Sequence, residues 1–286
     1  MKRKYRTYVY YAIIILCIIA AYMYIQTKEG FDEAPGLNYT VDSKIKVFTY
    51  ATEMKPTLRL LLHSLKAHNY SYEVVGFGTP WKGFRNRVAT YLSAVKKYRE
   101  TAGDEAVAVI LDGYDCLCIK NSEAVYNSFI NKPRSIPVLF GVEIYCLQNC
   151  NKDILKWYDH HGLLGGKKEI TKQLENIPEG IVSKKPVYLN GGMVIGTSSG
   201  LEEVYTGMMN LNIEDDQICA STYVISNMDK VDLDVEEVIF RNKKVTTEEP
   251  LSDEDGSNGP GFLHFPGSAD KKNFSDLLKI YDLYFD

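Results

Sequence analysis

The chain has 286 residues, of which 45% are hydrophobic and 24% are charged, and this composition is typical of a globular protein with a sizeable core. Its 33 basic and 37 acidic residues give a net charge of -4. The sequence beyond the N-terminus has no long basic run, so the charge pattern gives no reason to expect a nucleic-acid partner.

The N-terminus is basic over residues 1–8 and then uncharged and strongly apolar over residues 9–25. At about 1.5 Å per residue, a helix over this run is roughly 25 Å long, close to the thickness of a bilayer core. Positive charge before the run predicts a cytoplasmic tail at 1–8, a transmembrane signal anchor at 9–25 and a linker at 26–43. A cleaved signal peptide is the alternative, although the run is longer than a usual h-region and no small-x-small cleavage site closes it.

This arrangement predicts a single-pass, type II membrane protein. Its body, residues 44–286, would lie in the lumen of the endoplasmic reticulum or Golgi. Three sequons begin at Asn38, Asn69 and Asn273, and they would make the chain a glycoprotein in that compartment.

Short β-rich runs alternate with helical stretches between residues 45 and 142. Strands are predicted at 45–50, 72–77, 106–111 and 136–142, and helices are predicted at 55–68, 85–99 and 123–130. The run at 106–111 is apolar throughout, which is typical of a strand that is buried on both faces. This order predicts an α/β fold with a mixed, mostly parallel sheet.

The regular alternation stops at residue 143, where a long irregular segment to residue 185 is predicted. Acidic residues favour a helix N-terminus, so one of the later helices is expected to begin at 214–216. The segments that follow are PVYLN at 186–190, the Gly-Gly pair at 191–192, an apolar run at 193–196, a predicted helix from 199, a predicted strand at 238–240, an acidic loop at 246–260 and a closing helix from 273.

Two carboxylates follow the predicted strand at 106–111. Asp112 and Asp115 lie at its carboxyl end, where open α/β sheets bind ligands, and their oxygen atoms suit a hard divalent cation. Tyr114 lies between them and offers a ring on which a base can stack. A turn is the alternative, because Asp-Gly favours turns and a flanking Asp can cap the backbone.

Seven short motifs occur in the order and approximate spacing of one family. They are IKVFTYAT at 45–52, HNY at 68–70, VGFGTPWKG at 75–83, LDGYD at 111–115, YLNGG at 188–192, DDQ at 215–217 and LH at 263–264. Through these motifs the chain resembles the glycosyltransferase domain of the procollagen lysyl hydroxylase (procollagen-lysine dioxygenase) family over residues 44–283. The resemblance implies a GT-A-type, Rossmann-like fold and a UDP-sugar transferase that uses Mn2+ or another divalent cation.

The resemblance also implies roles for individual residues. Asp112, Asp115 and His264 would hold the metal, which would neutralise charge on the UDP leaving group. The donor would be bound by Thr49 and Tyr114 at the nucleotide, Trp81 in the donor or acceptor pocket, Arg87 at a phosphate, and Asn190, Gly191 and Gly192 at the sugar. Three carboxylates are the candidate catalytic residues: Asp215, Asp216 and Glu143, the last at the end of the fourth predicted strand. The simpler readings are a packed aromatic for Trp81, a turn at 190–192 and a charged helix N-terminus at 214–216.

Three segments depart from the family pattern: GFRNR at 83–87 in place of a Gly-rich Gln-Lys segment, CL at 146–147 in place of Trp-Pro, and FP at 265–266 in place of Gly-Asn. No His-x-Asp pair follows His264, so the sequence predicts a free-standing glycosyltransferase without the dioxygenase domain.

The expected reaction moves glucose or galactose from a UDP-sugar to a hydroxyl acceptor, with hydroxylysine or galactosyl-hydroxylysine of a collagen-like protein as candidates. The alternative is a catalytically silent, membrane-tethered nucleotide- or glycan-binding protein of the same fold.

Overall fold

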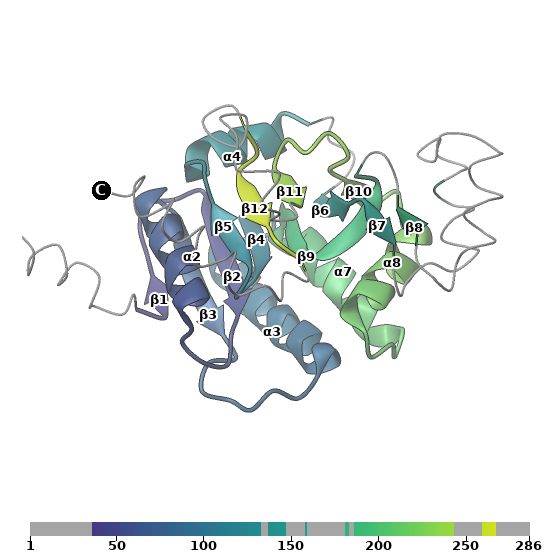
Figure 1. Ribbon diagram of the computed structural model, residues 1–286, viewed down its shortest axis with the longest axis horizontal. Helices are drawn as coiled ribbons and strands as arrows, with labels where there is room; N and C mark the ends of the chain where they lie inside the picture. The colour runs from purple at the N-terminus through teal and green to yellow at the C-terminus, as the bar shows by residue number, and fades with distance from the viewer. Residues whose placement is uncertain are drawn as a thin grey trace, which may run out of the picture. The chain divides into compact units, whose positions relative to one another are not determined.

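The structure is a computed structural model that describes residues 36–132, 137–146, 158, 181–182, 186–242 and 259–266 (Figure 1). The chain divides into two compact units, Met1–Gly36 and Leu37–Asp286, and every helix and strand described below belongs to the second unit. The predicted anchor at 9–25 and the predicted closing helix from 273 lie outside the described residues. Within the described ranges, no helix combines the length and apolar character that a membrane span requires.

Twelve strands and five helices lie in the described ranges. The strands are β1 (Asn38–Tyr39), β2 (Ile45–Tyr50), β3 (Ser71–Val75), β4 (Val107–Asp112), β5 (Cys116–Cys118), β6 (Val138–Glu143), β7 (Tyr145–Cys146), β8 (Ile181–Val182), β9 (Tyr188–Thr197), β10 (Val231–Leu233), β11 (Phe240–Asn242) and β12 (Phe262–His264). The helices are α2 (Pro56–Ala67), α3 (Phe84–Ala102), α4 (Ser122–Ile130), α7 (Ser198–Asn210) and α8 (Asp216–Ile225). The four strands and three helices predicted before residue 143 are confirmed, with small shifts at their ends.

Seven strands form the main sheet, in the order β1-β3-β2-β4-β9-β6-β10. β2 pairs in parallel with β3 and β4, and β6 pairs in parallel with β10. The other three pairings, of β1 with β3 and of β9 with both β4 and β6, are antiparallel. β1 and β9 run opposite to the other five strands of this sheet, so the sheet is mixed and mostly parallel, as predicted, with β9 entering between β4 and β6 in the opposite direction.

The two faces of the main sheet pack against different helices. Alternate side chains of β2 and β4 point to opposite faces, so Phe48 and Ile110 join one core while Val47 and Val109 join the other. Residues of α3, α7 and α8 complete the first core, and residues of α2 and α4 complete the second. Figure 1 shows α2 and α3 running beside the strands β2 and β3. The sheet is therefore the middle of three layers, and the strand ends are the part of it that the described helices leave uncovered.

Local signals explain where the helices begin. Pro56 starts α2, where its fixed φ angle and missing N–H cost nothing. Thr197 and Asp215 are the N-caps of α7 and α8, and their side-chain oxygens accept hydrogen bonds from Gly200 N and Ile218 N. The predicted helix starts at 199 and at 214–216 are confirmed to within one or two residues.

Two segments after residue 143 differ from the sequence interpretation. The turn considered at 190–192 is not formed, because these residues and the apolar run at 193–196 lie in one continuous strand, β9, with neighbours on both sides. The strand predicted at 238–240 instead spans 240–242, because the buried carboxylate of Asp234 accepts hydrogen bonds from Val238 N, Ile239 N and Phe240 N and holds that segment in a turn. The segment 143–185 was predicted to be irregular, and within it the structure describes β7 and β8 as an antiparallel pair.

A small sheet of β11, β12 and β5 lies against the end of β4 (Figure 1). β12 runs antiparallel to β5, with His264 opposite Cys116, and parallel to β11, with Asn242 beside His264. Because β5 begins directly after Asp115, this pairing brings residue 264 to the turn at residues 112–115.

Candidate functional site

The turn between β4 and β5 carries the two carboxylates. Asp112 is the last residue of β4 and pairs with Tyr50 at the end of β2. At Gly113 an added Cβ would lie 2.4 Å from the carbonyl oxygen of Tyr50, so only glycine lets the chain turn this close to β2. The tight turn places Asp115 beside the small sheet, where it faces His264.

Asp112, Asp115 and His264 converge on one point. The Nε2 atom of His264 lies 3.4 Å from Asp115 Oδ1 and 3.8 Å from Asp112 Oδ2. Asp115 Oδ1 and His264 Nε2 are buried atoms that have no hydrogen-bond partner among the described residues. A buried polar atom without a partner costs free energy, and a cation between these two atoms would remove that cost.

The electrostatics at His264 favour positive charge. Burial disfavours the imidazolium, but the charges of Asp115 and Asp112 outweigh burial and raise the pKa of His264. Two carboxylate oxygens and one imidazole nitrogen are also a suitable donor set for Mn2+. The three predicted ligands therefore fit a divalent cation both in geometry and in chemistry.

Cys116 is a neighbour that sequence reasoning did not assign. Its Sγ atom belongs, with ligand atoms of Asp115 and His264, to a group in which all atoms lie within 4.8 Å of one another. Burial raises the pKa of Cys116 well above its usual range, and its Sγ atom contacts the carbonyl oxygen of Gly192 at 4.0 Å. Cys116 lies opposite His264 in the small sheet. This pairing is known only once the strand register is known, so the sequence alone does not show that Cys116 lies beside the site.

Gly192 gives the His264 ring the space that it occupies. A Cβ at this position would lie 2.5 Å from His264 Cε1 and 3.0 Å from Asp112 Oδ2. At Gly191 the nearest atom to an added Cβ is Gln217 Cα, at 3.7 Å. The glycine that the site requires is therefore the second of the pair.

Arg87 joins two of the predicted carboxylates. Its Nη1 atom donates to Asp112 Oδ1 at 2.7 Å, and its Nε atom donates to Asp216 Oδ2 at 2.9 Å, with a further contact from Nη2 to the same oxygen. Burial works to lower the pKa of Arg87, but Asp112 and Asp216 outweigh it and hold this pKa above its usual range. Because Oδ1 of Asp112 is bound by Arg87, Oδ2 is the atom that faces His264.

Glu143 lies in a network of amides. Its Oε1 atom accepts hydrogen bonds from Asn190 Nδ2 at 3.1 Å and from Gln217 Nε2 at 2.8 Å. The oxygens of the same two amides accept from Gly192 N at 2.9 Å and Gly191 N at 3.4 Å. Burial raises the pKa of Glu143, and the two donated hydrogen bonds oppose that shift. Gln217 was not among the predicted site residues, although it follows the two aspartates that were.

The other candidate carboxylates differ from Glu143 in their partners. Asp215 Oδ1 accepts from Ile218 N at 2.9 Å and so caps α8. Asp216, the first residue of α8, is held by Arg87, and burial raises its pKa against the opposing effect of that contact. The structure thus links Asp216 directly to Asp112, whereas Asp215 faces its own helix.

The predicted nucleotide residues lie on three different loops or strands. Thr49 is fully buried, and its hydroxyl donates to Leu111 O, so its side chain supports the strand end from inside.

The Tyr114 hydroxyl is fixed by the backbone of residues 52 and 53, and Lys55 Nζ lies 4.5 Å from the centroid of the Tyr114 ring. Trp81 is 50% exposed and packs edge-on against Tyr50. Tyr114 and Trp81 offer aromatic surface, whereas Thr49 does not reach solvent.

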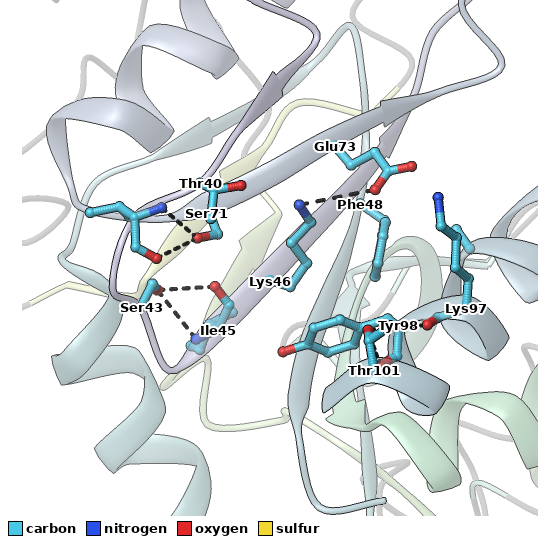
Figure 2. Close-up of a pocket in the computed structure, with 12 residues that line it drawn as sticks. Thr40, Ser43, Ile45, Lys46, Phe48, Ser71, Glu73, Lys97, Tyr98 and Thr101 are labelled. Carbon is cyan, nitrogen blue, oxygen red and sulfur yellow. Dashed lines mark hydrogen bonds and ion pairs between the residues drawn. The ribbon is translucent and has the colours of Figure 1, made fainter. Parts of the chain in front are cut away.

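A separate cavity of about 320 Å³ lies at the opposite strand ends, where β2 and β3 begin (Figure 2). Lys46 enters it and is bound to Tyr72 O at 3.3 Å and to Glu73 at 4.0 Å. None of the predicted site residues lines this cavity.

Comparison with known proteins relates the chain to one family. The family model described as the PLOD GT domain matches residues 41–158, a range that includes Arg87, Asp112 and Asp115. A multifunctional procollagen lysine hydroxylase and glycosyltransferase of Caenorhabditis elegans is 29% identical over 111 residues, which are 36% of this chain and 15% of that protein.

A solved glycosyltransferase involved in glycosylation of the major capsid of PBCV-1 is 10% identical, with a TM-score of 0.46 over 82% of this chain and 98% of that chain. The chain spans 15% of the length of the curated relative that it matches. Residues 41–158 are therefore similar to the glycosyltransferase domain of the PLOD family.

Proposed function

We propose that the chain is a metal-dependent, GT-A-type glycosyltransferase that moves glucose or galactose from a UDP-sugar to a hydroxyl acceptor. The observation that carries this proposal is the pair of buried atoms Asp115 Oδ1 and His264 Nε2, which have no hydrogen-bond partner among the described residues and face each other at 3.4 Å, an ion-pair distance, with Asp112 beside them. Hydroxylysine and galactosyl-hydroxylysine of a collagen-like protein are the acceptors to test first, because the curated relative is a procollagen lysine hydroxylase and glycosyltransferase.

Asp112, Asp115 and His264 would hold Mn2+ or another divalent cation, which would stabilise negative charge on the departing UDP. Arg87 orients Asp112 by occupying its Oδ1, so that Oδ2 stays directed at the cation position. The aromatic faces of Tyr114 and Trp81 would bind the uracil and line the donor pocket. Thr49 would act by holding the end of β2 in place.

The sugar would lie over Asn190, Gly191 and Gly192, where the glycines let a ligand approach the backbone closely. Glu143 holds the amide of Asn190 in this segment and the amide of Gln217 in α8, which in turn accepts from Gly191 N. Asp216, Asp215 and Glu143 are the candidates for the group that handles the acceptor proton. A general base must lie within hydrogen-bond reach of that proton, so a bound acceptor decides among them.

A membrane-tethered nucleotide- or glycan-binding protein without catalytic activity is the second candidate. The observation that favours it is the Arg87–Asp112 ion pair, which engages one oxygen of a predicted metal ligand. Both candidates predict binding of UDP. Only the first predicts that the protein releases UDP from a UDP-sugar.

We also propose that residues 9–25 anchor the chain as a type II membrane protein with its body in the lumen of the endoplasmic reticulum or Golgi. Asn38 and Asn69, which begin two of the sequons, are exposed and therefore accessible to glycosylation. Resistance of the protein to alkaline extraction, together with a glycosidase-sensitive mobility shift that Asn38→Gln and Asn69→Gln reduce, supports this placement. Complete extraction or the absence of any shift contradicts it.

The reaction itself is tested by a UDP-release assay on the full chain across a panel of UDP-sugars, with and without Mn2+. We expect release with UDP-glucose or UDP-galactose that depends on the metal and is abolished by Asp115→Asn. The matched control is Asp104→Asn, which removes a carboxylate from an exposed pair with Arg99 and should keep full activity. Turnover that Asp115→Asn leaves unchanged would refute the proposal, and UDP binding without turnover would favour the second candidate.

A further inference from the structure

Asn242 lies next to His264 in the small sheet, although 22 residues separate them in sequence. β11 and β12 are parallel, and their register makes Asn242 and His264 direct neighbours. The exposed fraction of His264 is 1%, so the surrounding residues bury its ring almost completely. The side chain of Asn242 is therefore the hydrogen-bond partner of Nδ1 in the buried His264 ring.

The orientation of the Asn242 amide is fixed by a backbone group. Its Nδ2 atom lies 2.6 Å from the carbonyl oxygen of Val142, in β6. A carbonyl can only accept a hydrogen bond, so the amide nitrogen must face it, since the reversed amide would set two oxygens 2.6 Å apart. The Oδ1 atom of Asn242 therefore faces the Nδ1 atom of His264, at 2.7 Å.

The amide orientation in turn decides which ring nitrogen carries the hydrogen. Oδ1 of an amide can only accept, so Nδ1 of His264 must be the donor. The neutral ring then has its lone pair on Nε2. This is the atom that lies 3.4 Å from Asp115 Oδ1 and has no hydrogen-bond partner among the described residues.

We propose that Asn242 is a positioning residue that fixes His264 in the Nδ1–H tautomer and so directs its Nε2 lone pair to the metal. This inference rests on the metal site of the proposed function. Residues that hold the second nitrogen of a metal-bound histidine typically change metal affinity by about 10- to 100-fold when they are removed. Asn242 also ties the ring to β6, one residue before Glu143, and so joins the two parts of the site.

The tautomer is measured first, without metal, by ¹⁵N NMR of the full chain with labelled histidine rings, at a pH at which the ring is neutral. The His264 signal is identified by its loss in His264→Gln. We expect the Nδ1–H form in the wild type, and a shift towards the Nε2–H form in Asn242→Leu, which keeps the size of the side chain and removes the acceptor. An Nε2–H tautomer in the wild type would overturn the inference, whether or not any variant folds.

Metal affinity is measured second, by titrating the same proteins with Mn2+ and following the free ion by EPR. We expect Asn242→Leu to weaken binding by about 10- to 100-fold, because it removes the acceptor that holds Nδ1 of His264. Asn227→Leu is the matched control, because the Asn227 amide also donates to a backbone carbonyl, that of Tyr223, and it should leave Mn2+ binding unchanged.

Affinity of folded Asn242→Leu equal to that of the wild type would overturn the inference and leave the metal site standing. Failure of the wild type to bind Mn2+ would instead refute the proposed function, and with it the role of Asn242. The two failures are distinguishable because only the second involves the unaltered protein.

Discussion

At the scale of single residues, the proposed metal ligands are held in position by close contacts with neighbouring residues. Gly192 lies against the His264 ring, and Arg87 holds one oxygen of Asp112 while the other faces that ring. Each of these residues acts on a predicted ligand without being one itself. Substitutions beside the ligands are therefore as informative as substitutions of the ligands.

Gly192→Ala should weaken Mn2+ binding by about 10-fold or more, because its Cβ would lie 2.5 Å from His264 Cε1 and push the ring out of position. Gly191→Ala is the matched control, since the nearest atom to its Cβ is 3.7 Å away, and it should bind Mn2+ as the wild type does. Mn2+ titration of both variants checks the prediction. Equal loss in the two variants would show that the effect is not specific to the ring contact.

Arg87→Met should destabilise the protein by about 3 kcal/mol, because it leaves two mostly buried carboxylates, Asp112 and Asp216, without their shared cation. Urea denaturation without added metal measures the free energy of unfolding. Arg99→Met removes a guanidinium from exposed pairs and should change stability far less. If both substitutions lowered the free energy of unfolding by similar amounts, the buried contacts of Arg87 with Asp112 and Asp216 would not have the stabilising role assigned to them.

At the scale of elements, the site is assembled from the ends of strands and the start of one helix. β4 supplies Asp112, β12 supplies His264, and α8 begins with Asp216 directly after its N-cap, Asp215. The small sheet is what joins the C-terminal segment to the turn after β4. Asp215, at the start of α8, can cap the helix or act in catalysis, and substitutions can separate these two roles.

Asp215→Ala should cost about 1 kcal/mol in stability, since it removes the oxygen that accepts from Ile218 N. Asp215→Asn keeps an oxygen for the cap and should unfold within a few tenths of a kcal/mol of the wild type. If Asp215 only caps the helix, UDP release by Asp215→Asn stays near that of the wild type. A large loss of UDP release by a fully stable Asp215→Asn would assign the carboxylate to catalysis instead.

At the scale of the whole molecule, the sequence predicted most local elements because their signals are local. β2 matches its prediction residue for residue, and β4 was recognised from its continuous apolar run. The direction of β9 could not be read from its residues, because antiparallel pairing with both β4 and β6 is a property of the sheet. The apparent Gly-Gly turn lies inside β9, where close packing of His264 requires a glycine at 192.

The same distinction applies to the candidate site. Asp112 and Asp115 were visible as a pair in one turn, and His264 was placed with them by family resemblance. Asn242 and Gln217 went unassigned because their partners, His264 and Glu143, lie 22 and 74 residues away in sequence. Contacts of this kind become visible only when the register of the strands is known.

The proposed function requires that Asp112, Asp115 and His264 bind a divalent cation that holds a UDP-sugar. This binding can be seen in a crystal structure of the full chain grown with Mn2+ and UDP, with anomalous data collected at the manganese edge. We expect one strong anomalous peak within coordination distance of Asp115 Oδ1, Asp112 Oδ2 and His264 Nε2, and uracil against Tyr114. A manganese peak away from these three atoms, or UDP bound elsewhere on the chain, would refute the proposed site.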